Sequence, residues 1–65
     1  LAEPLVFLAP MMAKHMTPKG YIILSGLLTN QVSMVVDAYV NCSFNLLKTL
    51  TYVEWATVIL QKENQ

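Results

Sequence analysis

The stretch Tyr21-Ile22-Ile23-Leu24-Ser25-Gly26-Leu27-Leu28-Thr29-Asn30-Gln31 decides the fold of this chain. It begins with four consecutive apolar residues, which Ser25 and Gly26 end before a patterned segment starts. A short apolar run bounded by turn residues is typical of a strand covered on both faces, as in a parallel sheet. The sequence therefore predicts a buried strand over residues 21–25, a turn at Ser25 and Gly26, and then the start of a helix.

The size and composition of the chain predict a partial domain. The chain has 65 residues, of which 55% are hydrophobic and 12% charged. A chain this short buries only about 60% of the surface that its unfolded form exposes. We infer that part of its apolar surface is meant for a partner or for the rest of a larger domain. Because the sequence also starts at Leu1 without an initiator Met, we expect residues 1–65 to form a single partial domain cut from a longer protein.

The charge pattern argues against nucleic-acid and membrane partners. Four basic and four acidic residues cancel and are spread along the chain, so they form no basic patch. The apolar stretches are far shorter than the ~18 residues of a membrane-spanning helix, and we find no signal peptide. A lone cysteine, Cys42, cannot form an internal disulfide, which makes the reducing cytoplasm the expected location.

A helix is expected before the strand, over residues 1–16 and beginning near Pro4, because proline suits the first helical position. Its apolar residues follow the spacing of one buried face: Leu5, Leu8, Ala9, Met12 and Met16. Pro10 interrupts this pattern and removes a backbone hydrogen bond, which predicts a bend or two short helical pieces. Residues 17–20, Thr-Pro-Lys-Gly, read as a turn.

A second helix is expected after the strand, capped by Thr29 or Asn30 and ended by residues 41–43. Its buried face is predicted by the strict spacing of Val32, Val35, Val36, Tyr39 and Val40. Residues 44–52 and 55–61 read as two strands joined at residues 53–54, and residues 62–65 as a frayed polar tail. The order helix-strand-helix-strand-strand predicts an α/β sheet with an antiparallel closing pair.

Several short motifs occur in an order that points to a known family. They are Leu-Ala-x-Pro-Leu at residues 1–5, Leu-Ser-Gly-Leu-Leu at 24–28 followed by Gln31, Ala-Tyr at 38–39 and Glu-Trp at 54–55. This order resembles the C-terminal part of the ribosomal protein L11 methyltransferases, the PrmA family of class I S-adenosylmethionine-dependent enzymes. Two departures are Glu3, where the family has glycine, and Leu-Gln-Lys at residues 60–62, where it has Gly-Arg-Lys.

The resemblance implies the C-terminal part of a Rossmann-like methyltransferase sheet. Residues 21–25 would be its fifth strand, and the last strand would lie antiparallel beside it. The parent enzyme would transfer a methyl group from S-adenosylmethionine to amines of a ribosomal protein. The family's cofactor loop and catalytic asparagine lie upstream of the matched motifs, so we expect no catalytic or cofactor-binding residue in these 65 residues, which alone should be inactive.

Three residues are candidates for the acceptor pocket: Ser25, Gly26 and Leu27. They lie at the carboxyl end of the predicted strand, where ligands bind in such sheets, and glycine would let a substrate chain approach the backbone. The alternative is a plain strand-to-helix turn that needs small residues. His15 and Cys42 lack neighbours suited to metal binding or catalysis and are expected to be structural. Trp55 is expected to anchor the edge of the strand that it opens.

A second functional hypothesis stays open beside the enzyme. A strand over residues 21–25 without its usual neighbour would expose an edge that invites association. The chain could therefore be a small non-enzymatic interaction protein, or the remnant of a split gene, that forms homo-oligomers through this edge.

Overall fold

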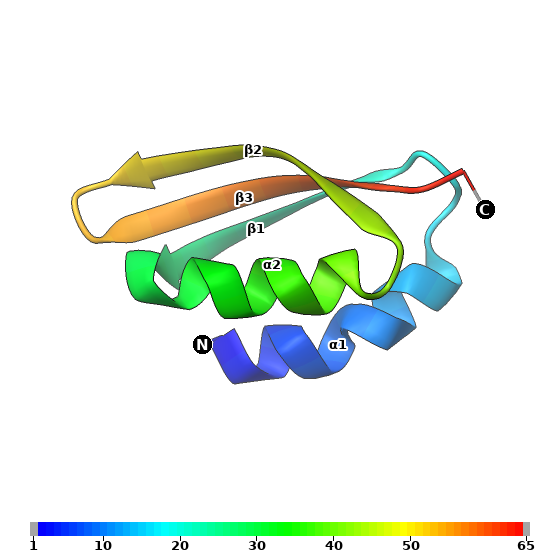
Figure 1. Ribbon diagram of the computed structural model, residues 1–65, viewed down its shortest axis with the longest axis horizontal. Helices are drawn as coiled ribbons and strands as arrows, with labels where there is room; N and C mark the ends of the chain where they lie inside the picture. Colours follow the sequence, from blue (N-terminus) through cyan, green and yellow to red (C-terminus); the bar gives the residue numbers. More distant parts are fainter. Residues whose placement is uncertain (1, 65) are drawn as a thin grey trace.

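The computed structural model describes residues 2–64, which form two helices and a three-stranded sheet (Figure 1). In chain order the elements are α1 (Ala2–His15), β1 (Tyr21–Leu28), the short 3-10 turn η1 (Thr29–Gln31), α2 (Val32–Val40), β2 (Phe44–Tyr52) and β3 (Trp55–Lys62). The expected α/β order of helix, strand, helix, strand and strand is confirmed. Neither of the described helices is long and apolar enough to cross a membrane.

The last strand, β3, occupies the middle of the sheet, whose order is β1-β3-β2. It is antiparallel to both neighbours, so β1 and β2 run parallel to each other. Ile59 lies opposite Ile23 of β1, and Thr57 lies opposite Leu50 of β2. The expectation that the final strand lies antiparallel beside the first one is therefore confirmed.

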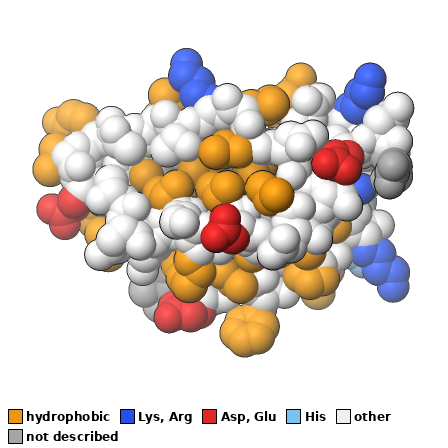
Figure 2. All heavy atoms as spheres, viewed as in Figure 1, with side chains coloured by type: hydrophobic (Ala, Val, Ile, Leu, Met, Phe, Trp, Pro, Cys, Tyr) orange, Lys and Arg blue, Asp and Glu red, His pale blue; other side chains and the backbone are white. Residues whose placement is uncertain are grey.

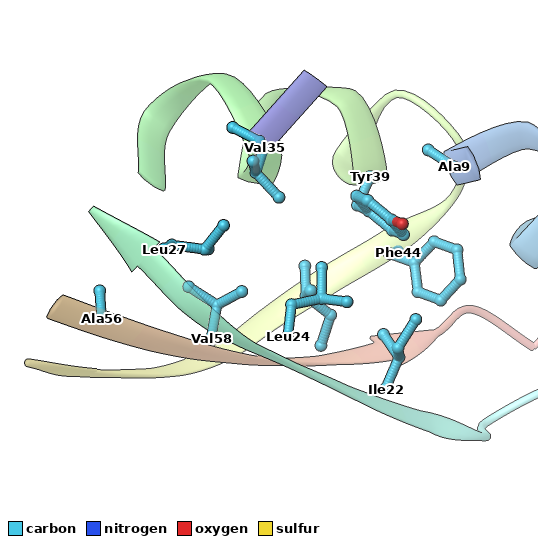
Figure 3. Close-up of a cluster of buried hydrophobic side chains, with 11 residues drawn as sticks. Ala9, Ile22, Leu24, Leu27, Val35, Tyr39, Phe44, Ala56 and Val58 are labelled. Carbon is cyan, nitrogen blue, oxygen red and sulfur yellow. The ribbon is translucent and has the colours of Figure 1, made fainter. Parts of the chain in front are cut away.

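The core lies on one face of the sheet, beneath the helices (Figure 3). Because side chains alternate along a strand, every second residue of β3 points to this face, and so do alternate residues of β1 up to Leu24, after which a bulge adds one residue. These buried residues are Ile22, Leu24 and Leu27 in β1, and Ala56, Val58 and Leu60 in β3. They pack with Phe44 of β2 and with Val35 and Tyr39 of α2, two of the residues that the helical spacing predicted to be buried.

The opposite face of the sheet, the open face, is not covered by any described element. Tyr21 and Ile23 are 65% and 63% exposed there, and the burial of β1 alternates along the strand. The prediction that this strand is covered on both faces is therefore wrong for the described chain. An unbroken apolar run indicates that both faces of a strand are suited to burial, but it does not supply the element that covers the second face.

β1 does not end at Ser25 as predicted; it continues through a bulge to Leu28. Leu24 pairs with Val58, but the next pair is Leu27 with Ala56, so β1 contains one residue more than β3 across this interval. Gly26 has a φ of 77°, a left-handed conformation that favours glycine. The same residue types serve a turn or a bulge, which is why the expected turn at Ser25 and Gly26 was wrong.

α1 begins at Ala2 rather than near Pro4 and runs as one helix through Pro10, which excludes two separate pieces and leaves the bend as the remaining alternative. Ala9 is buried as predicted, whereas Leu8 is 40% exposed. The helix packs against α2, and the Tyr39 hydroxyl donates a hydrogen bond of 2.9 Å to the Leu5 carbonyl. This bond fixes the position of α1 along α2.

The start of α2 also differs from the prediction, because neither Thr29 nor Asn30 caps it with a side chain. Instead, Oε1 of Gln31 accepts a hydrogen bond of 3.0 Å from the backbone N–H of Leu28. At the other end of the helix, Val40 is 47% exposed although its spacing predicted burial. At about 3.6 residues per turn, Val40 lies at the margin of the apolar stripe opposite the buried Val35.

The predicted polar tail is wrong at its start. Lys62 belongs to β3 and is 7% exposed, and its backbone N–H donates a 2.8 Å hydrogen bond to the carbonyl of Gly20. The next residue, Glu63, donates through its backbone N–H to the Ser43 carbonyl, also at 2.8 Å. Gln65, with Leu1 at the other end, lies outside the described residues. Backbone pairing thus continues two residues beyond the predicted strand.

The Tyr39 hydroxyl gives a first testable prediction. Tyr39→Phe removes the bond to Leu5 but keeps the ring against Phe44, so it should lower the unfolding free energy by about 1 kcal/mol near neutral pH. Burial, and secondarily the charge of Cys42, raises the pKa of Tyr39 above its usual 10.0. The wild-type contribution is therefore complete below pH about 10 and is lost as pH rises through the folded pKa.

Urea unfolding of wild type and Tyr39→Phe, near neutral pH and above pH about 10, measures both effects. The stability difference should shrink at the higher pH. Tyr52→Phe is the matched control because Tyr52 is 79% exposed, and it should change stability little. A stability difference that stays constant or grows with pH would contradict the assignment.

Candidate functional site

The carboxyl ends of β1 and β2 meet at one end of the sheet, which we call the carboxyl edge (Figure 1). They do so because both strands are antiparallel to β3. Trp55, the first residue of β3, lies opposite Leu28 of β1 and Tyr52 of β2. The backbone N–H of Thr29 donates a 2.9 Å hydrogen bond to the Glu54 carbonyl. This bond ties the end of β1 to the β2-β3 hairpin, so the hairpin belongs to the same edge.

The structure separates the three acceptor-pocket candidates. Ser25 and Gly26 are exposed in the bulge, whereas Leu27 is only 1% exposed and points into the core beneath Val35 (Figure 3). A Cβ atom added at Gly26 would meet nothing within 4 Å, so there is room for a side chain at this position. Glycine is favoured here by the backbone conformation and not by lack of space. Ser25 and Gly26 are therefore available to a ligand, and Leu27 supports the bulge from the core.

Ser25 is held by its neighbour across the sheet. The Thr57 hydroxyl donates a 3.1 Å hydrogen bond to Oγ of Ser25, so the two side chains lie together on the open face. A serine becomes a nucleophile when an adjacent base takes its proton, and a threonine hydroxyl is not such a base. The pair is suited to position a ligand by hydrogen bonding rather than to react with it.

A hollow of about 160 Å³, which we call the Trp55 hollow, adjoins the bulge at the carboxyl edge. It draws residues from all three strands: Gly26, Leu50, Thr51, Tyr52, Trp55, Ala56 and Thr57. Sequence reasoning considered only Gly26 and Trp55 among them, and it treated Trp55 as an edge anchor. Trp55 instead opens the central strand and is half exposed. Leu50 and Tyr52 are two residues apart in β2, and this spacing could have predicted that they lie on the same face of the sheet.

Nothing in residues 2–64 resembles a metal or nucleoside site. No group of three His, Cys, Asp or Glu side chains lies close enough to hold a metal ion among these residues. His15 ends α1, and Cys42 is a half-buried free thiol. Pockets for cofactors usually measure roughly 300–1,000 Å³, well above the Trp55 hollow. The chain has two glycines, Gly20 and Gly26, and no glycine-rich loop. At its volume, the Trp55 hollow is too small for S-adenosylmethionine.

Fold and site together define an α/β sheet segment in which two parallel strands end at one edge, beside an exposed bulge and a small hollow. The family model "Ribosomal protein L11 methyltransferase (PrmA)" matches residues 1–63. The chain therefore belongs to the ribosomal protein L11 methyltransferase family, as its motifs suggested.

Similar proteins include three named ribosomal protein L11 methyltransferase. The one from Chelativorans sp. strain BNC1 is 47% identical over 62 residues, which are 95% of this chain and 21% of that protein. The one from Mesorhizobium japonicum is 44% identical over 61 residues, which are 94% of this chain and 21% of that protein. The one from Agrobacterium fabrum is 36% identical over 63 residues, which are 97% of this chain and 22% of that protein. The chain spans about a fifth of the length of these relatives.

The bulge gives a second testable prediction. Gly26→Ala should lower the unfolding free energy by about 1–2 kcal/mol, because alanine disfavours the left-handed conformation at φ 77°. Gly26→Asn should cost less, since asparagine tolerates this conformation. Urea unfolding of both variants measures the difference. A loss for Gly26→Asn as large as that for Gly26→Ala, or larger, would contradict the assignment of glycine to its backbone conformation.

Proposed function

We propose that this chain forms the C-terminal part of a methyltransferase catalytic domain that transfers a methyl group from S-adenosylmethionine to amines of ribosomal protein L11. The family match over residues 1–63 carries the proposal. The antiparallel placement of β3 between two parallel strands supports it, because it agrees with the implied Rossmann-like sheet in which β1 is the fifth strand. We further propose that the enzyme works in the cytoplasm.

Ser25, Gly26 and Leu27 would form one wall of the acceptor site. S-adenosylmethionine supplies the methyl group when bound, and the residues that hold it lie outside this chain. Methyl transfer depends mainly on the proximity and orientation of the amine. The exposed bulge offers the Ser25 hydroxyl and the bare backbone of Gly26 for that purpose, while the buried Leu27 keeps the bulge fixed. The wall therefore positions the acceptor and contributes no proton transfer.

The outer edge of β1 is suited to pair with another strand of the enzyme. β1 contains no charged residue and no proline, and its side chains are apolar on both faces from Tyr21 to Leu24. Exposed edge strands in proteins are usually protected by charges, prolines or bulges. β1 has its bulge at Ser25 and Gly26 but no charge, whereas the outer strand β2 combines a charge, Lys48, with a register shift between Leu46 and Lys48. This contrast favours β1 as an interior strand of a larger sheet.

A chimeric enzyme tests the proposal. This chain would replace the matching 62 residues of the Chelativorans relative, and methylation of ribosomal protein L11 would be followed with radiolabelled S-adenosylmethionine. We expect activity within about tenfold of the parent, a change of about 1.4 kcal/mol in the barrier. The relative lacking those residues is the control and should be inactive. A chimera that folds and binds cofactor but methylates nothing would contradict the proposal.

The alternative function, homo-oligomerisation, is favoured by the same β1 edge. If the 65 residues exist alone, a second copy can pair with the uncharged edge of β1 before its bulge, at residues 21–24. Light scattering should then detect dimers or larger species whose fraction rises with concentration.

The Ile23→Lys variant places a charge on this edge strand and should reduce association at least tenfold. Ile59→Lys is the matched control, because Ile59 lies opposite Ile23 but belongs to the central strand. A wild-type chain that stays monomeric at high concentration would rule out this alternative. An equal effect of the two variants would indicate stacking of open faces instead.

A further inference from the structure

The Trp55 hollow lies where a ligand of the proposed enzyme would arrive. Gly26 contributes both to the hollow and to the candidate acceptor wall. The hydrogen bond between Thr29 and Glu54 holds the hairpin beside the end of β1. Hollow and acceptor wall are therefore two neighbouring parts of one surface at the carboxyl edge.

Both aromatic side chains of the hollow are exposed. Tyr52 is 79% and Trp55 50% exposed, although each could bury about 150–250 Å². Exposed apolar patches on small proteins often mark binding sites. Val53 between them has a φ of 56°, a conformation that a β-branched residue rarely adopts. Strained backbone of this kind clusters at ligand-binding positions.

The chemistry of the lining selects the kind of ligand. None of the seven lining residues carries a charge, so the hollow offers no ion-pair partner to an ammonium group or a carboxylate. Its volume of about 160 Å³ compares with the roughly 150 Å³ in which an apolar cavity holds a benzene molecule. Lys48 precedes Leu50 at the two-residue spacing of one strand face, and its charge would repel a cationic side chain. One uncharged aliphatic or aromatic side chain fits these properties.

The geometry points to the Trp55 hollow as a subsite for one apolar side chain of the acceptor polypeptide, close to the amine that is methylated. The inference rests on the proposed function and adds a residue-selecting contact to it. Trp55 and Tyr52 provide apolar walls, and the Ser25 and Thr57 hydroxyls face the adjoining backbone of the acceptor. The subsite would select the sequence around the methylated amine by the size and apolarity of a neighbouring residue.

Titration of the isotope-labelled 65-residue chain with N-acetyl-phenylalaninamide tests binding directly. We expect shifts in the NMR signals of Gly26, Thr57 and the Trp55 indole, with a Kd of about 1 mM for a ligand of this size. N-acetyl-lysinamide should shift them at least tenfold less. Equal or stronger binding of the lysine probe would overturn the inference. Shifts of the same signals on raising the protein concentration alone would also overturn it, since a second copy would then occupy the hollow.

Variants separate the hollow from the rest of the open face. Trp55→Ala and Leu50→Ala each remove a wall and should weaken binding of the phenylalanine probe at least tenfold. Two variants are used so that a folding defect in one leaves the other informative. Ile23→Ala is the matched control, because Ile23 is 63% exposed on the same face outside the hollow, and it should leave binding unchanged. Equal weakening by all three variants would overturn the inference.

The chimeric enzyme distinguishes failure of the subsite from failure of the proposed function. In an active chimera, Leu50→Ala should raise the KM for ribosomal protein L11 at least fivefold and leave kcat within twofold. An unchanged KM in an active chimera would contradict the proposed subsite but not the proposed function. A large fall in melting temperature with unchanged KM would mean that another part of the enzyme fills the hollow, and would contradict the subsite too. An inactive chimera whose isolated segment still binds the probe would contradict the proposed function instead.

Discussion

The antiparallel position of β3 between β1 and β2 is the constraint on which the rest of the structure depends. It makes the two flanking strands parallel, and it therefore brings their carboxyl ends to one edge. It also returns the β2-β3 hairpin to that edge, where Glu54 accepts a hydrogen bond from Thr29. The bulge at Ser25 and Gly26 and the Trp55 hollow both lie beside this junction. Without β3 in the middle, the candidate site would be scattered over separate strands.

The two faces of the sheet differ sharply in how they are covered. On one face, α2 places Val35 and Tyr39 on the core, and the Tyr39 hydroxyl holds α1 through Leu5. On the other, apolar side chains of all three strands remain exposed. Figure 2, in the view of Figure 1 with the sheet and the helices side by side, shows further hydrophobic side chains along the middle of the molecule, with charged side chains scattered around them. The apolar open face, together with the uncharged edge of β1, suits a segment completed by a larger body.

Local patterns predicted the fold wherever the period was unambiguous. The helical spacing of Val35 and Tyr39 identified the buried face of α2, and apolar β-branched residues located both strands of the hairpin. The start of α2 and the bulge in β1 depend instead on contacts that the local sequence does not show. The side chain of Gln31 accepts a hydrogen bond from the backbone N–H of Leu28, three residues earlier. Sequence preferences for helix caps favoured Thr29 or Asn30 and did not predict this contact. The bulge escaped detection because it shows only in the pairing of β1 with a strand thirty residues away.

The candidate site was predictable only in part. Ser25 and Gly26 were found from their position after an apolar run, but Leu27 next to them faces the core, because the bulge reverses the direction of the following side chains. Tyr52 joined the site through the sheet register, which a single strand's sequence does not contain. The family resemblance supplied the activity that the residues alone do not encode.

The central claim is that β1 is an interior strand whose missing neighbour belongs to the rest of the enzyme. Amide hydrogen exchange of β1, in the 65-residue chain and in the chimeric methyltransferase, tests it most directly. The account predicts slow exchange of β3 amides in both proteins. It predicts that the amides on the outer edge of β1 exchange rapidly in the short chain and become protected in the chimera. Rapid exchange along that edge in a folded chimera would contradict the account.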